Sequence, residues 1–264
     1  GDEDYTPDGS TRGTIEVAGF VTDHDINLSF GWSMISTNLV LDHDEVPWLF
    51  TELVARGSLI LIKDQLGRFY APPDFNNLPG WSNNEGYLIK TARSDVLTLT
   101  GEPVAPDEAI GLEAGWNMIS YYPVWEMDAR DAFASLLEND NLSIVKDDMG
   151  HFYKPGLNFS NLGNASLGEG YLVNVANGVE FQYPAEEPGV DAISVTDQPL
   201  EHLSAPISTG NNMSWLVRSV GGFVDIELAV LNSAGTICGA ARMIDNYNVG
   251  ISVWGDDPTT TEID

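Results

Sequence analysis

The residues with which this chain could perform acid–base or nucleophilic chemistry are four histidines and one cysteine, Cys238. None of them lies in a catalytic motif, since the sequence contains no Gly-x-Ser-x-Gly, no His-Glu-x-x-His and no glycine-rich phosphate loop. Cys238 lies in an apolar run, which is typical of a buried structural thiol. We therefore expect a protein that is not an enzyme. The alternative is an enzyme whose catalytic carboxylates are distant in sequence and meet in space.

Aromatic side chains in loops are the next candidates, because a planar ring can stack on a sugar ring. Trp81 lies in the loop Pro-Gly-Trp-Ser-Asn-Asn, where Asn83 and Asn84 offer amide groups to a hydroxyl-rich ligand. Trp48 is a second tryptophan without an aromatic counterpart in the internal repeat of the chain. We predict these four residues as ligand-binding. The alternative is that both tryptophans pack on their own domain.

Carboxylates could bind a hard cation such as Ca²⁺, which prefers oxygen ligands. Asp256 and Asp257 precede Pro258 and are the predicted contributors to a calcium site, with an ordinary turn as the alternative. The acidic runs at residues 23–25 and 42–45 each contain a histidine and could also offer ligands, although such runs are usually solvated turns. We expect no other cofactor, and a single cysteine excludes a thiolate-rich metal site.

The balance of charge restricts the partners. The 264 residues contain 40 Asp and Glu against 11 Lys and Arg, which gives a formal net charge of −29. Nucleic acids and anionic membrane surfaces demand a basic face, so we expect neither as a partner. No apolar run approaches the ~18 residues of a membrane-spanning helix, and we expect no membrane insertion.

An internal repeat dominates the chain and must position these residues. The sequence GWSMIS at residues 31–36 returns as GWNMIS at residues 115–120, and IKDQLGRFY at residues 62–70 returns as VKDDMGHFY at residues 145–153. Both matches keep one offset of roughly 84 residues, which indicates two copies of one module. Repeated aromatic side chains are predicted to form the core of each copy. They are Trp32, Trp116, Phe50, Phe133, Tyr87 and Tyr171.

Each copy has the pattern of about five strands and one helix. Asp44 and Asp128 precede apolar stripes of helical spacing, and we predict that each caps the N-terminus of a helix. Gly67 and Gly150 follow the Lys-Asp pairs and can supply the positive φ of a hairpin turn. The expected fold class is therefore α+β and mainly β.

Four segments are predicted from these patterns. Residues 1–27 form an acidic linker with a possible extra strand near residues 14–21, and residues 28–103 form the first module. Residues 104–187 form the second module. Residues 188–264 contain short apolar runs separated by Gly, Asn and Ser, which indicates a small all-β, sandwich-like domain.

The repeated motifs resemble a module found, often in tandem, in large secreted and cell-surface proteins of Bacteroidetes-like bacteria that use type IX secretion. Residues 227–264, which include Cys-Gly-Ala-Ala and Asp-Asp-Pro-Thr-Thr, resemble a second domain of the same proteins. That resemblance implies that the last domain lacks its final strand, and either the strand has been removed or another chain supplies it.

The resemblance also implies a location and a role. It places the chain outside the cell or at the cell surface, as a noncatalytic structural, adhesive or assembly segment of a bacterial surface protein. The implied partner is a neighbouring protein subunit or a surface polysaccharide. The alternative is a carbohydrate-binding module attached to a secreted glycan-degrading system.

Overall fold

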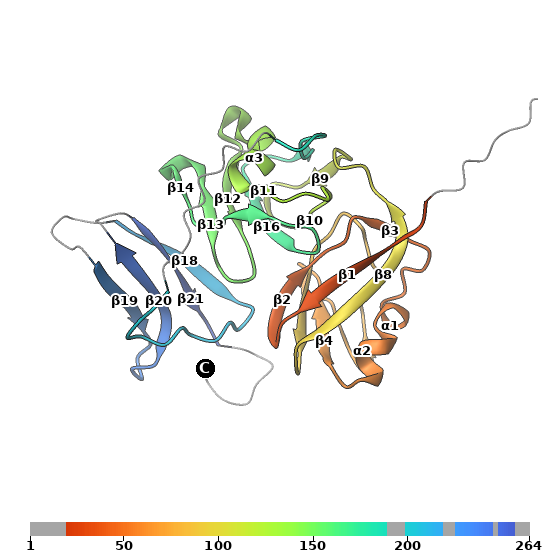
Figure 1. Ribbon diagram of the computed structural model, residues 1–264, viewed down its shortest axis with the longest axis horizontal. Coiled ribbons are helices and arrows are strands. Elements are labelled where there is room, and N and C mark those ends of the chain that lie inside the picture. The colour runs from red at the N-terminus through yellow and green to blue at the C-terminus, as the bar shows by residue number, and fades with distance from the viewer. Residues whose placement is uncertain (1–19, 189–198, 219–224, 245–247, 257–264) are drawn as a thin grey trace, which may run out of the picture.

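The computed structural model describes residues 20–188, 199–218, 225–244 and 248–256 (Figure 1). It shows an α+β protein that is mainly β, as the sequence predicts, with several antiparallel sheets and a few short helices. The strand expected near residues 14–21 lies outside the described residues, except for its last two positions, which are not in a strand.

Module 1 contains a five-stranded antiparallel sheet in the order β2-β7-β4-β5-β6 and a three-stranded sheet in the order β1-β8-β3. Strand β1 pairs with β8 along its whole length, so it belongs to module 1 although it lies within the stretch expected as a linker. The elements are β1 (Thr22–Leu28), β2 (Gly31–Ile35), β3 (Leu39–Leu41), α1 (Val46–Leu49), α2 (Thr51–Ala55), β4 (Leu59–Lys63), β5 (Phe69–Ala71), β6 (Phe75–Asn76), β7 (Tyr87–Thr91) and β8 (Asp95–Pro103).

Module 2 repeats the five-stranded sheet in the order β10-β16-β12-β13-β14, so the repeat in sequence is also a repeat in topology. Its small sheets pair β11 with β15 and β17 with β9. The elements are β9 (Ile110–Leu112), β10 (Gly115–Ser120), β11 (Met127–Asp128), α3 (Ala129–Ala132), η1 (Ala134–Asp140), β12 (Leu142–Lys146), β13 (Phe152–Lys154), η2 (Pro155–Leu157), β14 (Phe159–Ser160), β15 (Asn164–Ala165), β16 (Gly170–Val175) and β17 (Val179–Phe181).

The two predicted helix caps differ. The carboxylate of Asp128 accepts a hydrogen bond from the Arg130 backbone N–H at 2.8 Å, which confirms this cap. The prediction for Asp44 is wrong, because α1 begins after Glu45 and no side chain caps it. Pro47 lies in the first turn of α1, where its missing N–H and its fixed φ favour a helix start without a side-chain cap.

The core of each module contains the predicted aromatic pair. Phe50 and Tyr87 in module 1 and Phe133 and Tyr171 in module 2 are each no more than 1% exposed. In each copy the predicted helix is divided into two short helical segments that meet at this phenylalanine. The phenylalanine is buried in the same apolar cluster as the tyrosine of β7 or β16.

The repeated tryptophans lie on the other face of the two sheets. Successive side chains of β2 point to opposite faces of the sheet, so Trp32 and Met34 lie on the face opposite to the core residue Ile35. They belong to a separate small apolar cluster. Trp32 is 4% exposed, as predicted for the core, but Trp116 is 52% exposed, so the prediction for Trp116 is wrong. The difference arises because Gly210, in the segment that leads into the C-terminal strands, packs against the Trp32 ring, whereas no described glycine of that part of the chain approaches Trp116.

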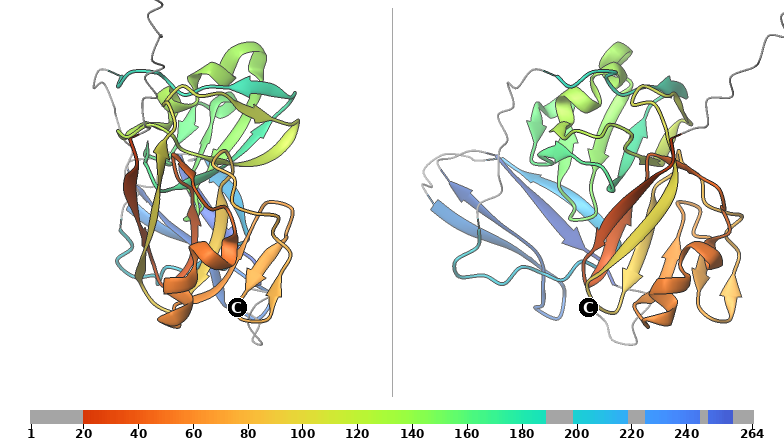
Figure 2. Two further views of the ribbon diagram at one scale, coloured as in Figure 1. Left: turned by 90° about the vertical axis from the view of Figure 1, so that its right-hand side faces the viewer. Right: turned by 45° about the vertical axis from the view of Figure 1, so that its right-hand side comes forward.

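The C-terminal part contains β18 (Asn212–Val217), β19 (Asp225–Leu231), β20 (Ile237–Ile244) and β21 (Val249–Trp254), in two pairs, β18-β21 and β19-β20. It has a small apolar core of its own, and we call it the β domain. The β domain lies beside module 2 (Figure 2). The Lys146 ammonium donates a hydrogen bond to the Asn212 carbonyl at 3.2 Å, and a Cβ on Gly210 would lie 2.7 Å from the Trp32 ring.

The two modules meet through the same residues of each copy. The Met34 backbone N–H donates to Asp148 Oδ2 at 3.1 Å, and the Met118 N–H donates to Gln65 Oε1 at 2.8 Å. Met34 aligns with Met118 in the repeat, and Gln65 aligns with Asp148. The contacts thus occur in related pairs, as in an isologous dimer, although both halves belong to one chain.

A pair of glycines marks the centre of this contact. A Cβ on Gly86 would lie 3.0 Å from the Ile119 carbonyl oxygen, and a Cβ on Gly170 would lie 3.1 Å from the Ile35 carbonyl oxygen. Isolated β-bridges join Ile35 to Glu169 and Glu85 to Ile119 at the same place. Larger residues would separate the two sheets here, which explains why both copies carry glycine before the tyrosine.

Candidate functional site

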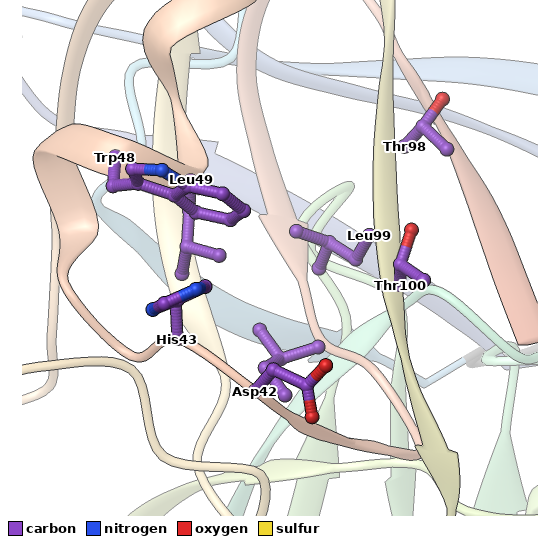
Figure 3. A pocket seen from close by; sticks show the side chains of 8 residues that line it. Asp42, His43, Trp48, Leu49, Thr98, Leu99 and Thr100 are labelled. Atoms are coloured by element: carbon purple, nitrogen blue, oxygen red, sulfur yellow. The ribbon is translucent and has the colours of Figure 1, made fainter. Parts of the chain in front are cut away.

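A pocket of about 350 Å³ opens in module 1 between α1 and β8 (Figure 3). Trp48 forms one wall and is 60% exposed. Its indole lies beside the His43 imidazole, with ring centroids 4.6 Å apart at an angle of 46°. Figure 3 shows these two rings facing Leu99 across the pocket. The lining residues are Leu41, Asp42, His43, Trp48, Leu49, Thr98, Leu99 and Thr100.

The local sequence holds Trp48 in this position. Val46 and Phe50 on either side of it are buried and anchor the short helices to the core. The Thr51 hydroxyl donates to the carbonyls of Trp48 and Pro47, at 2.8 and 3.1 Å, and fixes the junction between α1 and α2. The indole therefore projects from an anchored segment.

A second pocket of about 230 Å³ adjoins the first and shares Leu41 and Asp42 with it. Its remaining lining residues are Val40, Asp44, Trp81 and Asn83. Both pockets lie where β3 leads into α1, next to the loop that precedes β7. We call the two together the Trp48 cleft.

Trp81 does not offer an open ring face, contrary to the prediction. It is 7% exposed and stacks on Tyr87, with ring centroids 4.3 Å apart and an angle of 25°. Its backbone N–H donates to the Asp44 carbonyl at 2.7 Å, and the close approach of Asp44 to Gly80 leaves no room for a Cβ there. Its indole N–H is buried and has no hydrogen-bond partner among the described residues.

The structure brings three of the four predicted ligand-binding residues together. Trp48, Trp81 and Asn83 line the Trp48 cleft. The Asn84 side chain instead accepts a hydrogen bond from the Ser82 hydroxyl, and its backbone carbonyl accepts one from the Ser120 N–H at 3.3 Å in the contact between modules. Asp42 and His43 line the cleft too, and the sequence suggested them only as metal ligands. Their position five or six residues before a lone tryptophan was the available signal.

The charge around the Trp48 cleft is negative. Asp42 and Asp44 line it, and Glu45 lies 3.8 Å from the His43 ring. Neither lysine nor arginine is among its lining residues. An anionic ligand would be repelled by these carboxylates, so the cleft suits a neutral or a cationic molecule.

A third, smaller pocket of about 90 Å³ lies where both modules meet the β domain. Burial lowers the pKa of Lys146 there to about 8 and raises the pKa of Asp148 to about 7, with Asp147 and Glu169 adding to the second shift. The Lys146 ammonium donates a hydrogen bond to Asn212, and the Asp148 carboxylate accepts one from the Met34 N–H. These groups hold the three parts together, and the small pocket leaves little room for a ligand.

No group of three or more His, Cys, Asp or Glu side chains that could hold a metal ion occurs among the described residues. Asp256 is described and Asp257 is not, so the predicted calcium site stays a prediction. Within the described part of the chain, no helix is both long and apolar enough to cross a membrane.

Fold and site together define an α+β, mainly β protein in which a tandem pair of modules carries a β domain on one face and a cleft in module 1. Comparison with protein-family models, curated proteins and solved structures gave no match for the chain.

Proposed function

We propose that this chain is a noncatalytic structural, adhesive or assembly segment of an extracellular bacterial surface protein. A difference between equivalent faces of the two modules supports the assembly role most directly. The tandem pair has two equivalent surfaces, and the β domain covers one of them.

The aromatic residues at the covered surface are buried, and their equivalents are exposed. Trp32 and Phe159 are 4% and 8% exposed, whereas the aligned Trp116 and Phe75 are 52% and 46% exposed. A Cβ on Gly250 of the β domain would lie 2.8 Å from the Phe152 ring, which shows how closely the β domain covers this surface. The surface with Trp116 and Phe75 has the same architecture without the cover, and we call it the open face.

The open face has the composition of an interaction surface. Leu66 at the tip of the β4–β5 hairpin is exposed, and Phe69 stacks on Phe75 with ring centroids 4.5 Å apart. A contiguous patch of exposed apolar side chains on a soluble protein commonly marks a site of contact with another protein. We infer that a second copy covers the open face in an assembly.

Sedimentation velocity over a range of chain concentrations tests this role. We expect the chain to self-associate, and Trp116→Lys or Phe75→Lys to leave it monomeric with an unchanged melting temperature. Val96→Lys changes an exposed apolar residue of the three-stranded sheet and serves as the control. Monomers at every concentration, or equal association of all variants, would contradict the assembly role.

The histidines that could act in catalysis already contact neighbouring side chains, which supports the noncatalytic part of the proposal. His151 pairs with Asp147 at 2.6 Å in a hairpin turn, and His24 Nδ1 lies 2.9 Å from the buried Thr37 hydroxyl. Incubation of the purified chain with polysaccharides and peptides tests it, with no turnover expected. Hydrolysis that co-purifies with the chain would overturn this part of the proposal.

A further inference from the structure

We propose that the Trp48 cleft binds a neutral saccharide, with one sugar ring stacked on Trp48 and neighbouring hydroxyl groups hydrogen-bonded to Asp42, Asn83 and the Trp81 indole N–H. This site is separate from the open face, so it does not depend on the assembly role.

The platform is the indole of Trp48. Trp48, Trp116 and Trp215 are the exposed tryptophans among the described residues, and Trp48 lines the pocket of about 350 Å³. The apolar face of an indole attracts the C–H face of a pyranose ring, and an anchored ring loses little conformational entropy on binding. The His43 ring packs beside it, with ring centroids 4.6 Å apart and tilted by 46°, and borders the binding surface on that side.

The second observation is the unpaired donor of Trp81. Its indole N–H has almost no surface exposed to solvent and no hydrogen-bond partner among the described residues, so a ligand oxygen reaches it only when the Trp81 loop moves. Other atoms of the residue line the second pocket. A buried donor without an acceptor is unfavourable, so a ligand atom that accepts this hydrogen bond would be stabilised. The oxygen of a sugar hydroxyl is such an acceptor.

The other polar groups of the cleft require a ligand that also donates. The carboxylates of Asp42 and Asp44 only accept hydrogen bonds when ionised, and the Asn83 amide both donates and accepts. An ammonium or guanidinium group can donate to the carboxylates but has no acceptor for the Trp81 N–H. An anion has acceptors but meets like charge. A neutral polyol satisfies both kinds of group, which favours a saccharide over either ion.

The repeat supplies an internal comparison. Trp48 aligns with Asp131 of module 2, and Trp81 aligns with the buried Ala165. Module 2 therefore lacks both the platform and the indole donor, although it shares the fold. Each chain therefore has one saccharide site, and it lies in module 1.

Isothermal titration calorimetry of the whole chain tests the inference, with neutral hexasaccharides of β-glucose, α-glucose, β-mannose and β-xylose as probes. At least one probe should bind with one site per chain. Trp48→Ala should weaken binding at least tenfold. Trp116→Ala changes a similarly exposed tryptophan outside the cleft and should leave binding unchanged. Quenching of tryptophan fluorescence by the same probe should disappear in Trp48→Ala.

A second variant separates the donor from the ring. Trp81→Phe keeps an aromatic ring against Tyr87 and removes the N–H, and binding should weaken about fivefold or more. Asn83→Ala, a change at a partly buried loop residue, should also weaken binding and serves if Trp81→Phe lowers the melting temperature. Lack of binding by all four probes at millimolar concentration would overturn the inference, as would unchanged binding by Trp48→Ala. Binding of a basic peptide in place of the saccharides would also overturn it.

Discussion

Replacing Asp148 by asparagine is expected to stabilise the chain at alkaline pH and to have little effect at acidic pH. Asp148 Oδ2 accepts the Met34 N–H across the contact between modules, and the neutral Gln65 makes the equivalent bond with Met118. Burial, together with the nearby Asp147 and further acidic groups, raises the pKa of Asp148 from 3.8 to about 7. An amide at this position keeps the acceptor and removes the charge.

The stabilisation expected from Asp148→Asn at alkaline pH follows from the linkage between protonation and folding. The folded state holds the Asp148 proton more tightly than the unfolded state, so this carboxyl is most favourable for folding below about pH 4. Its contribution is lost as the pH rises through about 7. At about 1.4 kcal/mol for each pH unit, the loss would reach about 4 kcal/mol by pH 9 for a fully buried group. Asp148 retains some exposure to solvent, so we expect about 2 to 3 kcal/mol.

Urea unfolding at pH 5.5 and pH 9 measures this effect. The free energy of unfolding of Asp148→Asn should exceed that of the parent chain by about 2 to 3 kcal/mol at pH 9 and by about half as much at pH 5.5, because pH 5.5 lies between the unfolded and folded pKa values of this carboxyl. Asp74→Asn removes an equal charge from an exposed position and should show no such dependence on pH. A difference for Asp148→Asn that is the same at both pH values, or that grows as the pH falls, would refute the reasoning.

Two further substitutions test how the three parts are joined. Gly170→Ala should lower stability by about 1 to 3 kcal/mol, because the added methyl group meets the Ile35 carbonyl. Gly156→Ala, where a Cβ meets open space, is its control, and equal losses in thermal unfolding would contradict the close contact between modules. Lys146→Met should remove the hydrogen bonds to Asn212 and increase amide hydrogen exchange in β18 and β21, but not in β16. Unchanged exchange in β18 would show that this lysine does not hold the β domain.

The sequence predicted the folds of the two modules well because each copy tests the other. An apolar stripe that appears twice at the same place, with Phe50 in one copy and Phe133 in the other, indicates a buried helix face more securely than one stripe does. The aligned strands then fall into the same sheet order in both modules. The failed cap at Asp44 shows the limit, because the proline three positions later is a local signal that outweighs a good capping residue.

The arrangement of the modules and the cleft could not be predicted in this way. Trp32 and Trp116 occupy the same motif and differ in burial, because Gly210, more than 170 residues further along the chain, packs against the Trp32 ring. The pairing of Gln65 with Met118 joins residues whose local sequence gives no sign of a partner. His43 lines the cleft because β3 and α1 meet there, and no sequence motif predicts how these two elements meet.

The paired contacts between Met34 and Asp148 and between Met118 and Gln65 have a consequence for how such a protein can evolve. In a dimer of two identical chains, every mutation changes both sides of the contact at once and must suit both. Duplication of the module within one chain removes that restriction, so each half can diverge alone. The glutamine of one half and the aspartate of the other, and a tryptophan pocket in the first module only, are differences that identical subunits could not have acquired.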